Sequence, residues 1–386
     1  MIPLKVGIVG WGNVAMHRHA PVLQELEETT VAAVADSVRE RREEARRRLR
    51  LSKGSVFESH DAMLSESQLD YVLISVPPAL RRPIIEDSLD AGVHVLSEKP
   101  LATRPADAKA LIDQYRATPI KFGIVHNYVY LPELSAIRGL IEEGAIGEVR
   151  HVGLRFMGVP DNPGHKDYRP QWRHQPQEAG GGILMDMIHV FYVAEYLMRD
   201  RIKAVSAVVD SLNDLGDSVE DITLAHLYFG RGYASVALSW GLGPGGLEVT
   251  GSKGRLVAPY AVTADGPVAV CDGLTVATRE GETTLPLANP RRIFDTFVKV
   301  HQDFARAVTE DREPAAPAEE GLHALEAAMA AYASAVIGKV VELPLRPEDP
   351  VFLQGTDGLR ALDPWPGSPV PRVRILGFES DMRSET

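Results

Sequence analysis

Short apolar runs alternate with longer amphipathic segments over the first 125 residues of the chain. The runs are rich in valine and isoleucine and end at glycine, proline or a charged residue, which predicts buried β-strands. They lie at 5–9, 31–35, 70–76, 92–96 and 120–125. The amphipathic segments predict helices at 16–27, 84–91 and 105–116. Because strands and helices alternate, we expect an α/β domain with a doubly wound parallel sheet.

The pattern changes after residue 125. Longer segments that alternate apolar and polar positions, several of them joined by direct turns, predict a large, mainly antiparallel open sheet. They lie at 148–157, 202–210, 222–229, 233–240, 247–250 and 255–258. Helices are expected at 132–143 and 318–340, and the chain is rich in proline and glycine from Pro344. We therefore expect three parts: a first domain over 1–125, a second α/β domain over 126–345, and an irregular tail over 346–386.

A glycine-rich turn joins the first predicted strand to the first predicted helix. Gly10, Gly12 and Ala15 form a G-x-G-x-x-A loop, in which the glycines permit a tight turn and a close approach to a pyrophosphate. The pyrophosphate would bind backbone amides at the start of the helix, here near Asn13 and Val14. Glycine turns also join strands to helices without any ligand, but the flanking strands favour a site. We therefore predict a Rossmann domain that binds a nicotinamide dinucleotide.

An acidic residue, Asp36, ends the second predicted strand about 20 residues after this loop, where a carboxylate accepts hydrogen bonds from adenosine ribose hydroxyls. A carboxylate would repel a 2′-phosphate, so Asp36 favours NAD over NADP. Ser37 and Arg39 keep NADP open as the alternative cofactor.

A lysine follows the fourth predicted strand, in the sequence Ser97-Glu98-Lys99-Pro100. Ligands of open α/β sheets bind beyond the carboxyl ends of parallel strands, which is where Lys99 lies. An ammonium group there can polarise a carbonyl or hold the oxygen of an alcohol that is being oxidised. The alternative is a solvated loop lysine without a catalytic role.

Three glycines at 180–182 precede a predicted helix that carries Asp186 and His189. These glycines would let the backbone approach a ligand closely. Asp186 and His189 are three positions apart and would share one helix face. A histidine is a suitable general base for a hydroxyl proton, and the aspartate can orient it or bind a substrate hydroxyl. The alternative is a buried histidine with structural hydrogen bonds only.

Aromatic and basic residues gather in the loop before these glycines. Tyr168, Trp172 and Arg173 are candidates for substrate binding, because arginine pairs well with a carboxylate or phosphate. A solvated loop with one aromatic anchor is the alternative. His126 and Asn127 follow the last strand of the first domain and are further candidates for substrate contact.

Four segments together resemble the glucose–fructose oxidoreductase, inositol dehydrogenase and rhizopine-catabolism family. They are GWGNVA from Gly10, SEKP from Ser97, GGGILMDMIH from Gly180, and EVTGSKGR from Glu248. The resemblance implies a Rossmann domain joined to a mostly antiparallel α/β domain, and a homodimer or homotetramer that pairs through the open face of the second sheet. It also implies cofactor contacts at Ser75, Pro77, Glu98 and Lys99, and contact between Lys99 and the substrate. The family usually has a histidine four residues after the aspartate, where this chain has Val190.

Together these features predict an NAD-dependent oxidoreductase that transfers hydride between nicotinamide and a ring carbon of a sugar, cyclitol or related polyol. It would act as a dehydrogenase or as a ketosugar reductase. Lys99 and His189 would handle the proton, and Asp186 would position them. Two alternatives stay open: a redox-neutral epimerisation or glycoside cleavage through a keto intermediate, and a catalytically silent NAD-binding regulator.

Composition narrows the partners. The formal net charge of −12 argues against nucleic acid. No apolar run is long enough to span a membrane and no secretory signal is visible, so we expect a cytoplasmic protein. The single cysteine, Cys271, can form neither a disulfide within the chain nor a thiolate metal site, and we expect no metal. The expected partner is a small polyol that can carry an anionic group.

Overall fold

The computed structural model describes residues 2–159, 171–212, 219–241, 243, 245–263, 266–271, 273–287 and 292–365. The chain forms two compact units, each with its own sheet. The first unit consists of Met1–Ala102, Asp107–Asn127 and Arg291–Leu322. The second unit consists of Thr103–Ala106, Tyr128–Pro290 and His323–Thr386.

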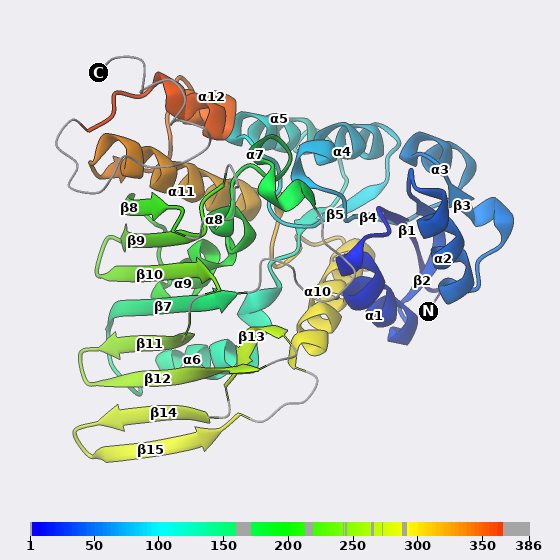
Figure 1. Ribbon diagram of the computed structural model, residues 1–386. Helices are drawn as coiled ribbons and strands as arrows, with labels where there is room; N and C mark the ends of the chain where they lie inside the picture. The colour runs from blue at the N-terminus through cyan, green and yellow to red at the C-terminus, as the bar shows by residue number, and fades with distance from the viewer. Residues whose placement is uncertain are drawn as a thin grey trace. The chain divides into compact units, whose positions relative to one another are not determined.

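The first unit is built on a six-stranded parallel sheet in the order β3-β2-β1-β4-β5-β6 (Figure 1). Its strands are β1 (Leu4–Val9), β2 (Thr29–Ala35), β3 (Val56–Phe57), β4 (Tyr71–Ile74), β5 (His94–Ser97) and β6 (Phe122–Ile124). The strand order reverses between β1 and β4, and ligands of such sheets bind beyond the carboxyl ends of the strands at that point. The expected doubly wound parallel sheet is confirmed.

The helices of this unit connect consecutive strands. They are α1 (Ala20–Glu25), α2 (Arg39–Leu49), α3 (His60–Glu66), α4 (Arg81–Asp90) and α5 (Pro105–Tyr115). A π turn over Ala15–His19 precedes α1, with the Ala20 N–H donating to the Ala15 carbonyl. The predicted helix at 16–27 therefore begins as a wider turn, because one extra residue is accommodated before α1.

A later segment of the chain returns to the first unit. Helix α10 (Arg292–Thr309) contacts α1 and the π turn. Its Phe304 is buried and meets Tyr71 of β4 edge to face, with ring centroids 5.2 Å apart. The sequence analysis predicted no helix here and placed this segment in the second domain. The structure places it with the first, because the apolar side of α10 is buried against residues that lie far away in the sequence.

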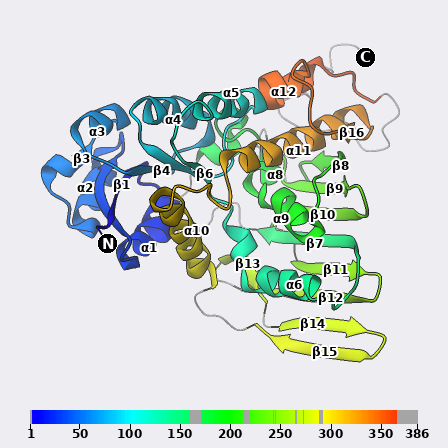
Figure 2. The ribbon, with the colours of Figure 1, turned by 180° about the vertical axis from the view of Figure 1, so that it is seen from behind.

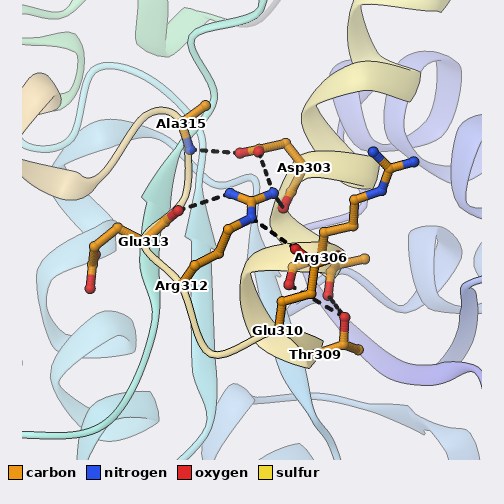
Figure 3. Close-up of polar contacts among 8 residues, drawn as sticks. Asp303, Arg306, Thr309, Glu310, Arg312, Glu313 and Ala315 are labelled. Atoms are coloured by element: carbon orange, nitrogen blue, oxygen red, sulfur yellow. Dashed lines mark hydrogen bonds and ion pairs between the residues drawn. The ribbon is translucent and has the colours of Figure 1, made fainter.

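An arginine holds the chain where it leaves α10 (Figure 3). Arg312 donates from Nη2 to Asp303 Oδ1 over 2.8 Å, from Nε to Glu310 Oε2 over 3.2 Å, and from Nη1 to the Glu313 carbonyl over 2.9 Å. Asp303 in turn accepts from the Ala315 N–H through Oδ2, over 2.7 Å. The turn after α10 is thus tied back to the helix by one guanidinium and one carboxylate.

The second unit is built on a ten-stranded sheet in the order β15-β14-β12-β11-β7-β10-β9-β8-β16, with β13 paired to β12. Among the described strands of this sheet, only β7 and β10 pair in parallel, so the expected mainly antiparallel sheet is confirmed. Its strands are β7 (Val149–Val159), β8 (Ala204–Asp210), β9 (Ile222–Tyr228), β10 (Tyr233–Trp240), β11 (Gly245–Gly251), β12 (Gly254–Thr263), β13 (Gly266–Val270), β14 (Gly273–Thr278), β15 (Gly281–Pro286) and β16 (Val341–Glu342).

Helices cover one face of this sheet, and Figure 2 shows α6 and α9 in front of it. The helices of this unit are α6 (Pro132–Glu142), α7 (Pro176–Ala179), α8 (Ile183–Asp186), α9 (His189–Met198), α11 (Ala318–Ile337) and α12 (Pro350–Gln354). The other face carries exposed apolar side chains on three neighbouring strands, Val208, Leu224 and Tyr233. The tail expected to be irregular includes α12 and a 3₁₀ turn over Gly355–Ala361 in its described part.

One stretch of the second unit passes a test for membrane spans by length and composition. Within the described ranges it is Pro176–Met198, with a mean hydropathy of 1.2. However, 83% of its most apolar window is buried inside the protein. This burial is typical of a core helix, and the stretch is divided among α7, α8 and α9.

Candidate functional site

The glycine loop of the first unit has the backbone that its sequence predicts. Gly10 has a φ of +91°, and a Cβ there would lie 2.8 Å from the Ser75 carbonyl oxygen, so only glycine fits. The Met16 N–H donates to the Gly12 carbonyl over 2.9 Å, which starts the helix at this residue. The amides of the first turn, at Asn13 and Val14, therefore point toward the carboxyl end of β1, as in an anion-binding helix start.

The carboxylate of Asp36 lies at the end of β2, beside this loop. Oδ2 accepts from the Trp11 N–H over 2.7 Å and Oδ1 accepts from the Val38 N–H over 2.8 Å. A carboxylate has about four acceptor sites, so two remain for ribose hydroxyls. Arg41 lies 3.9 Å from Oδ2 and is the nearest cation in an ion pair with it among the described residues. This donor and acceptor set fits the adenosine half of a nicotinamide dinucleotide.

Lys99 follows β5 and is half-buried. Its backbone N–H donates to Oε2 of Glu98 over 3.0 Å. Arg81, at the start of α4, donates from Nη1 to the carbonyls of Glu98 and Pro100. The loop that carries Lys99 is therefore held by a carboxylate and by a guanidinium.

Arg81 is a residue whose role the sequence did not predict. It is only 4% exposed, and burial lowers its pKa to about 10, against the raising effect of the Glu98 charge. Its Nε also donates to the Val76 carbonyl over 3.0 Å, so it links the loop after β4 to the loop after β5. Nothing in the local pattern separates it from the exposed arginines of this chain. Ser75 and Pro77 lie in the first of these loops and are half-buried.

His126 and Asn127 follow β6 and are both buried in the first unit. Burial lowers the pKa of His126 to about 3, so its ring is neutral. The Asn127 side chain donates to Thr296 Oγ1 of α10 over 3.0 Å. Asn127 was predicted to contact the substrate, and the side-chain hydrogen bond described here joins it to another residue of the protein.

In the second unit, Asp186 forms an ion pair with Arg173. Arg173 Nη1 lies 2.6 Å from Asp186 Oδ1, and the Trp240 indole donates to Oδ2 over 3.4 Å. The Arg173 guanidinium also lies over the Trp172 ring, 5.4 Å from its centroid. The structure therefore brings three predicted residues together, but it pairs the arginine with an internal carboxylate. Tyr168 lies outside the described residues.

The one-helix expectation for Asp186 and His189 is wrong, because α8 ends at Asp186 and α9 begins at His189. His189 is 4% exposed, and its ring stacks on Tyr128 with centroids 3.8 Å apart. Its Nδ1 lies 2.5 Å from the Tyr192 hydroxyl, which also accepts from the Tyr128 N–H over 3.2 Å. Burial, ring stacking and a hydrogen bond within the protein are typical of a structural histidine, which was the alternative interpretation of His189.

The glycines at 180–182 are required by packing inside the protein. A Cβ on Gly181 would lie 2.0 Å from the Tyr332 hydroxyl, and one on Gly182 would lie 2.0 Å from the Glu220 carbonyl oxygen. The fully buried Glu220 carboxylate accepts from the N–H groups of Gly182 and Leu184, over 2.9 and 3.0 Å, and from the Tyr332 hydroxyl over 2.7 Å. The glycine pattern predicts a ligand at this place and gives no sign of Glu220, which lies 38 residues after Gly182.

Comparison with known proteins identifies both halves of the chain. Residues 4–125 match the oxidoreductase family with an NAD-binding Rossmann fold, and residues 134–257 match the GFO/IDH/MocA C-terminal domain. A dTDP-3,4-didehydro-2,6-dideoxy-alpha-D-glucose 3-reductase of Streptomyces violaceoruber is 30% identical over 269 residues, 67% of this chain and 73% of the relative. A 1,5-anhydro-D-fructose reductase of Ensifer adhaerens is 27% identical over 294 residues, 75% of this chain and 84% of the relative. The solved aldose-aldose oxidoreductase of Caulobacter crescentus, complexed with glycerol, superposes with a TM-score of 0.76 at 25% identity over 88% of this chain and 100% of that chain.

Proposed function

Because the chain belongs to the GFO/IDH/MocA family of oxidoreductases, we propose that it is an NAD-dependent oxidoreductase acting on a ring carbon of a sugar, cyclitol or related polyol. Its relatives are named as reductases and dehydrogenases of sugars and sugar derivatives, which supports this substrate class. Whether it works as a dehydrogenase or as a ketosugar reductase depends on the substrate and is decided by the experiment below.

The observation that carries the proposal is the position of Lys99. It lies beyond the carboxyl end of β5, on a loop that Glu98 and Arg81 hold in place. An ammonium on a fixed loop can donate a hydrogen bond to a substrate oxygen and hold or release a proton there. When it is bound, the nicotinamide supplies or accepts the hydride. We propose that Lys99 is the group that donates the proton to the reacting oxygen of the substrate or accepts the proton from it.

NAD is the cofactor that we propose, on the evidence of Asp36. Its carboxylate is fixed by the amides of Trp11 and Val38, so it cannot turn away from an adenosine ribose without losing both hydrogen bonds. A 2′-phosphate would bring a second negative charge to this place. Arg41, at 3.9 Å, offers only partial compensation because its side chain is 42% exposed.

The second unit supplies polar groups suited to hydroxyls. The ion pair of Arg173 and Asp186 offers both donors and acceptors, and its charges balance. Such a pair suits a neutral polyol, whose hydroxyls donate and accept, better than it suits an anionic substrate. His189 remains a candidate for a second proton-transfer group.

The proposal is tested with purified protein, its bound dinucleotide identified by native mass spectrometry, and a panel of sugars and cyclitols. Reduced nicotinamide is followed by absorbance in both directions. We expect turnover of one member, and a loss of at least about 100-fold in kcat for Lys99→Met with retained dinucleotide binding. Lys109→Met is the matched control and should behave as the wild type, because Lys109 is exposed and forms an ion pair with Asp113, one turn further along α5.

Three results would contradict the proposal. A Lys99→Met protein that turns over at the wild-type rate would remove Lys99 from the chemistry. Product without net reduced nicotinamide would identify a redox-neutral reaction through a keto intermediate. Bound dinucleotide without product from any member of the panel would favour the silent regulator.

A further inference from the structure

A buried row of hydrogen bonds connects β4 and α10 to the loop of Lys99, all within the first unit. The Tyr71 hydroxyl lies 3.4 Å from Nδ1 of His301, and Nε2 of His301 lies 2.8 Å from Nδ1 of His19. Nε2 of His19 lies 2.9 Å from Oε1 of Glu98, whose Oε2 accepts from the Lys99 N–H. Tyr71, His301 and His19 are fully buried, and Glu98 is 6% exposed. Four side chains from separate elements thus end on one backbone amide.

The charge of Glu98 fixes the direction of its hydrogen bond with His19. Burial raises the pKa of Glu98, but the hydrogen bond from His19 and the charges of His19, Lys99 and Arg81 outweigh burial, and the pKa lies below its ordinary value. A carboxylate only accepts, so Nε2 of His19 donates to it. His301 and Tyr71 continue the row of hydrogen-bonding groups behind His19.

The row supports the carboxylate and does not supply protons to it. Burial lowers the pKa of His301 well below its ordinary value and raises the pKa of Tyr71, so both are neutral. Both are also fully enclosed among the described residues, with no exposed surface at the Tyr71 end. A proton taken up at Glu98 therefore has no path to solvent along these groups.

The π turn places His19 at this point. Within the turn, His19 is fully buried while His17 and Arg18 are half-exposed. Its ring meets Phe297 of α10 edge to face, with centroids 4.9 Å apart. A π turn holds one residue more than an α-helical turn, so it decides which side chain of this segment faces the Glu98 loop. Single π turns of this kind occur frequently at functional sites.

We propose that His19 is a positioning residue for Lys99, because it holds the Glu98 carboxylate that fixes the Lys99 backbone. The proposal rests on the function assigned to Lys99 above. The other titratable or charged groups that face Glu98 are Lys99 itself, Arg81 of α4, and the neutral His126 after β6. His19 is fully buried and bonds directly to the carboxylate side chain, over 2.9 Å.

Three variants test the proposal. His19→Leu removes the donor, His19→Gln keeps an N–H donor in similar volume, and Phe304→Leu is the matched control. Phe304 is buried on α10 against Tyr71 and forms no hydrogen bond through its side chain, so its truncation loosens the same core without removing a member of the row.

In turnover assays we expect His19→Leu to lower kcat about 10-fold, a size typical of residues coupled in one network, with KM changed less than about 2-fold. In the pH profile of kcat/KM for His19→Leu, the acid limb should move to higher pH. Without the hydrogen bond from His19, the effect of burial on the pKa of Glu98 dominates, and the carboxylate takes up a proton more readily. His19→Gln should recover most of kcat and the wild-type acid limb. Phe304→Leu should lower the melting temperature but keep the wild-type kcat and the wild-type acid limb. A wild-type acid limb in His19→Leu, or an equal loss of kcat in Phe304→Leu, would overturn the proposal.

Hydrogen exchange of the Lys99 amide, measured by mass spectrometry on the dinucleotide-loaded protein, gives a readout that needs no turnover. We expect exchange about 10-fold faster in His19→Leu than in Phe304→Leu, because only the first variant weakens the bond between the Lys99 N–H and Glu98. If the wild type turns over no substrate, the function proposed for Lys99 fails, and the exchange rates still decide whether His19 holds its backbone. Equal exchange in the two variants would refute the role of His19 even in an active enzyme.

Discussion

Replacing Glu220 by glutamine should destabilise the second unit strongly, although the two side chains have nearly the same shape. The Glu220 carboxylate accepts from two backbone amides, those of Gly182 and Leu184, and from the Tyr332 hydroxyl. Its own backbone carbonyl accepts from the Ile183 N–H over 3.1 Å. The turn that leads to Asp186 is therefore fastened to Glu220, just before β9, by three hydrogen bonds, and Tyr332 of α11 supplies a fourth bond to the same carboxylate.

The size of the effect follows from counting donors. A glutamine offers one acceptor oxygen and one NH₂ group where three donors converge, so at least one donor faces another donor. A buried donor without an acceptor costs about 1–3 kcal/mol, and the hydrogen bond that is lost contributes about 1 kcal/mol more. We expect Glu220→Gln to lose about 2–4 kcal/mol. Tyr332→Phe removes one donor and leaves the carboxylate two, so it should lose only about 1–2 kcal/mol.

Calorimetry is the appropriate assay, because it separates the transitions of two units that need not unfold together. For a unit of this size each kcal/mol lowers the melting temperature by roughly 2–4 °C. The loss in the double variant should differ from the sum of the single losses, since Glu220 and Tyr332 are in direct contact within one hydrogen-bond network. A Glu220→Gln melting temperature within about 1 °C of the wild type, or strict additivity, would refute the reasoning.

Two further predictions concern the first unit. Asp36→Asn should weaken NADH binding about 10-fold and reduce the preference of the protein for NADH over NADPH. The amide lacks the negative charge, and its NH₂ group faces one of the two backbone N–H donors. An unchanged ratio of the NADH and NADPH dissociation constants in fluorescence titrations would contradict this. Arg312→Ala should lose about 1–2 kcal/mol in urea denaturation, a value reduced by the partial exposure of its bonds to Asp303 and Glu310, and activity should be kept. Arg306→Ala, the control from the same network in Figure 3, should change stability by less than about 0.5 kcal/mol, because Arg306 is exposed.

Much of the first unit was predictable because its signals are local. The glycine loop needs a positive φ at Gly10, and that requirement is visible as a glycine between a strand and a helix. The buried strands appear as apolar runs because parallel strands are covered on both faces. Asp36 ends its strand as expected and lies beside the loop. These features depend on neighbours a few residues away or on one repeated unit of strand, turn and helix.

The return of α10 was not predictable in the same way. Its apolar positions show that one side is buried, but a periodic pattern does not say against which element. The partners of α10 are Tyr71 and the π turn, which lie more than 200 residues earlier in the chain. The row from Tyr71 to Glu98 therefore has no sequence signature, although each of its members is visible as a single polar residue.

The glycines at 180–182 illustrate a more specific limit. Their number indicated a close approach, and the approach is real, but the groups that come close are Tyr332 and Glu220 of the same unit. A glycine in the sequence indicates that there is no room for a side chain, but it does not indicate which group occupies the space. The break between Asp186 and His189 has a similar basis, because helical spacing predicts a shared face only if the helix is continuous.

Glu98 and Glu220 show how the chain converts two loops into fixed structures. Each is a buried carboxylate that accepts a backbone N–H of the loop, and each is held from behind by a side chain from a distant element, His19 for Glu98 and Tyr332 for Glu220. A buried carboxylate is costly unless its acceptor sites are filled, so a loop that moves away also removes the partner that makes the burial tolerable. Loop movement and carboxylate desolvation are thereby coupled. His19 and Tyr332 therefore act on the two loops through the carboxylates that they bind. The effects of substitutions at these two residues should be interpreted as effects on the conformation of the loops.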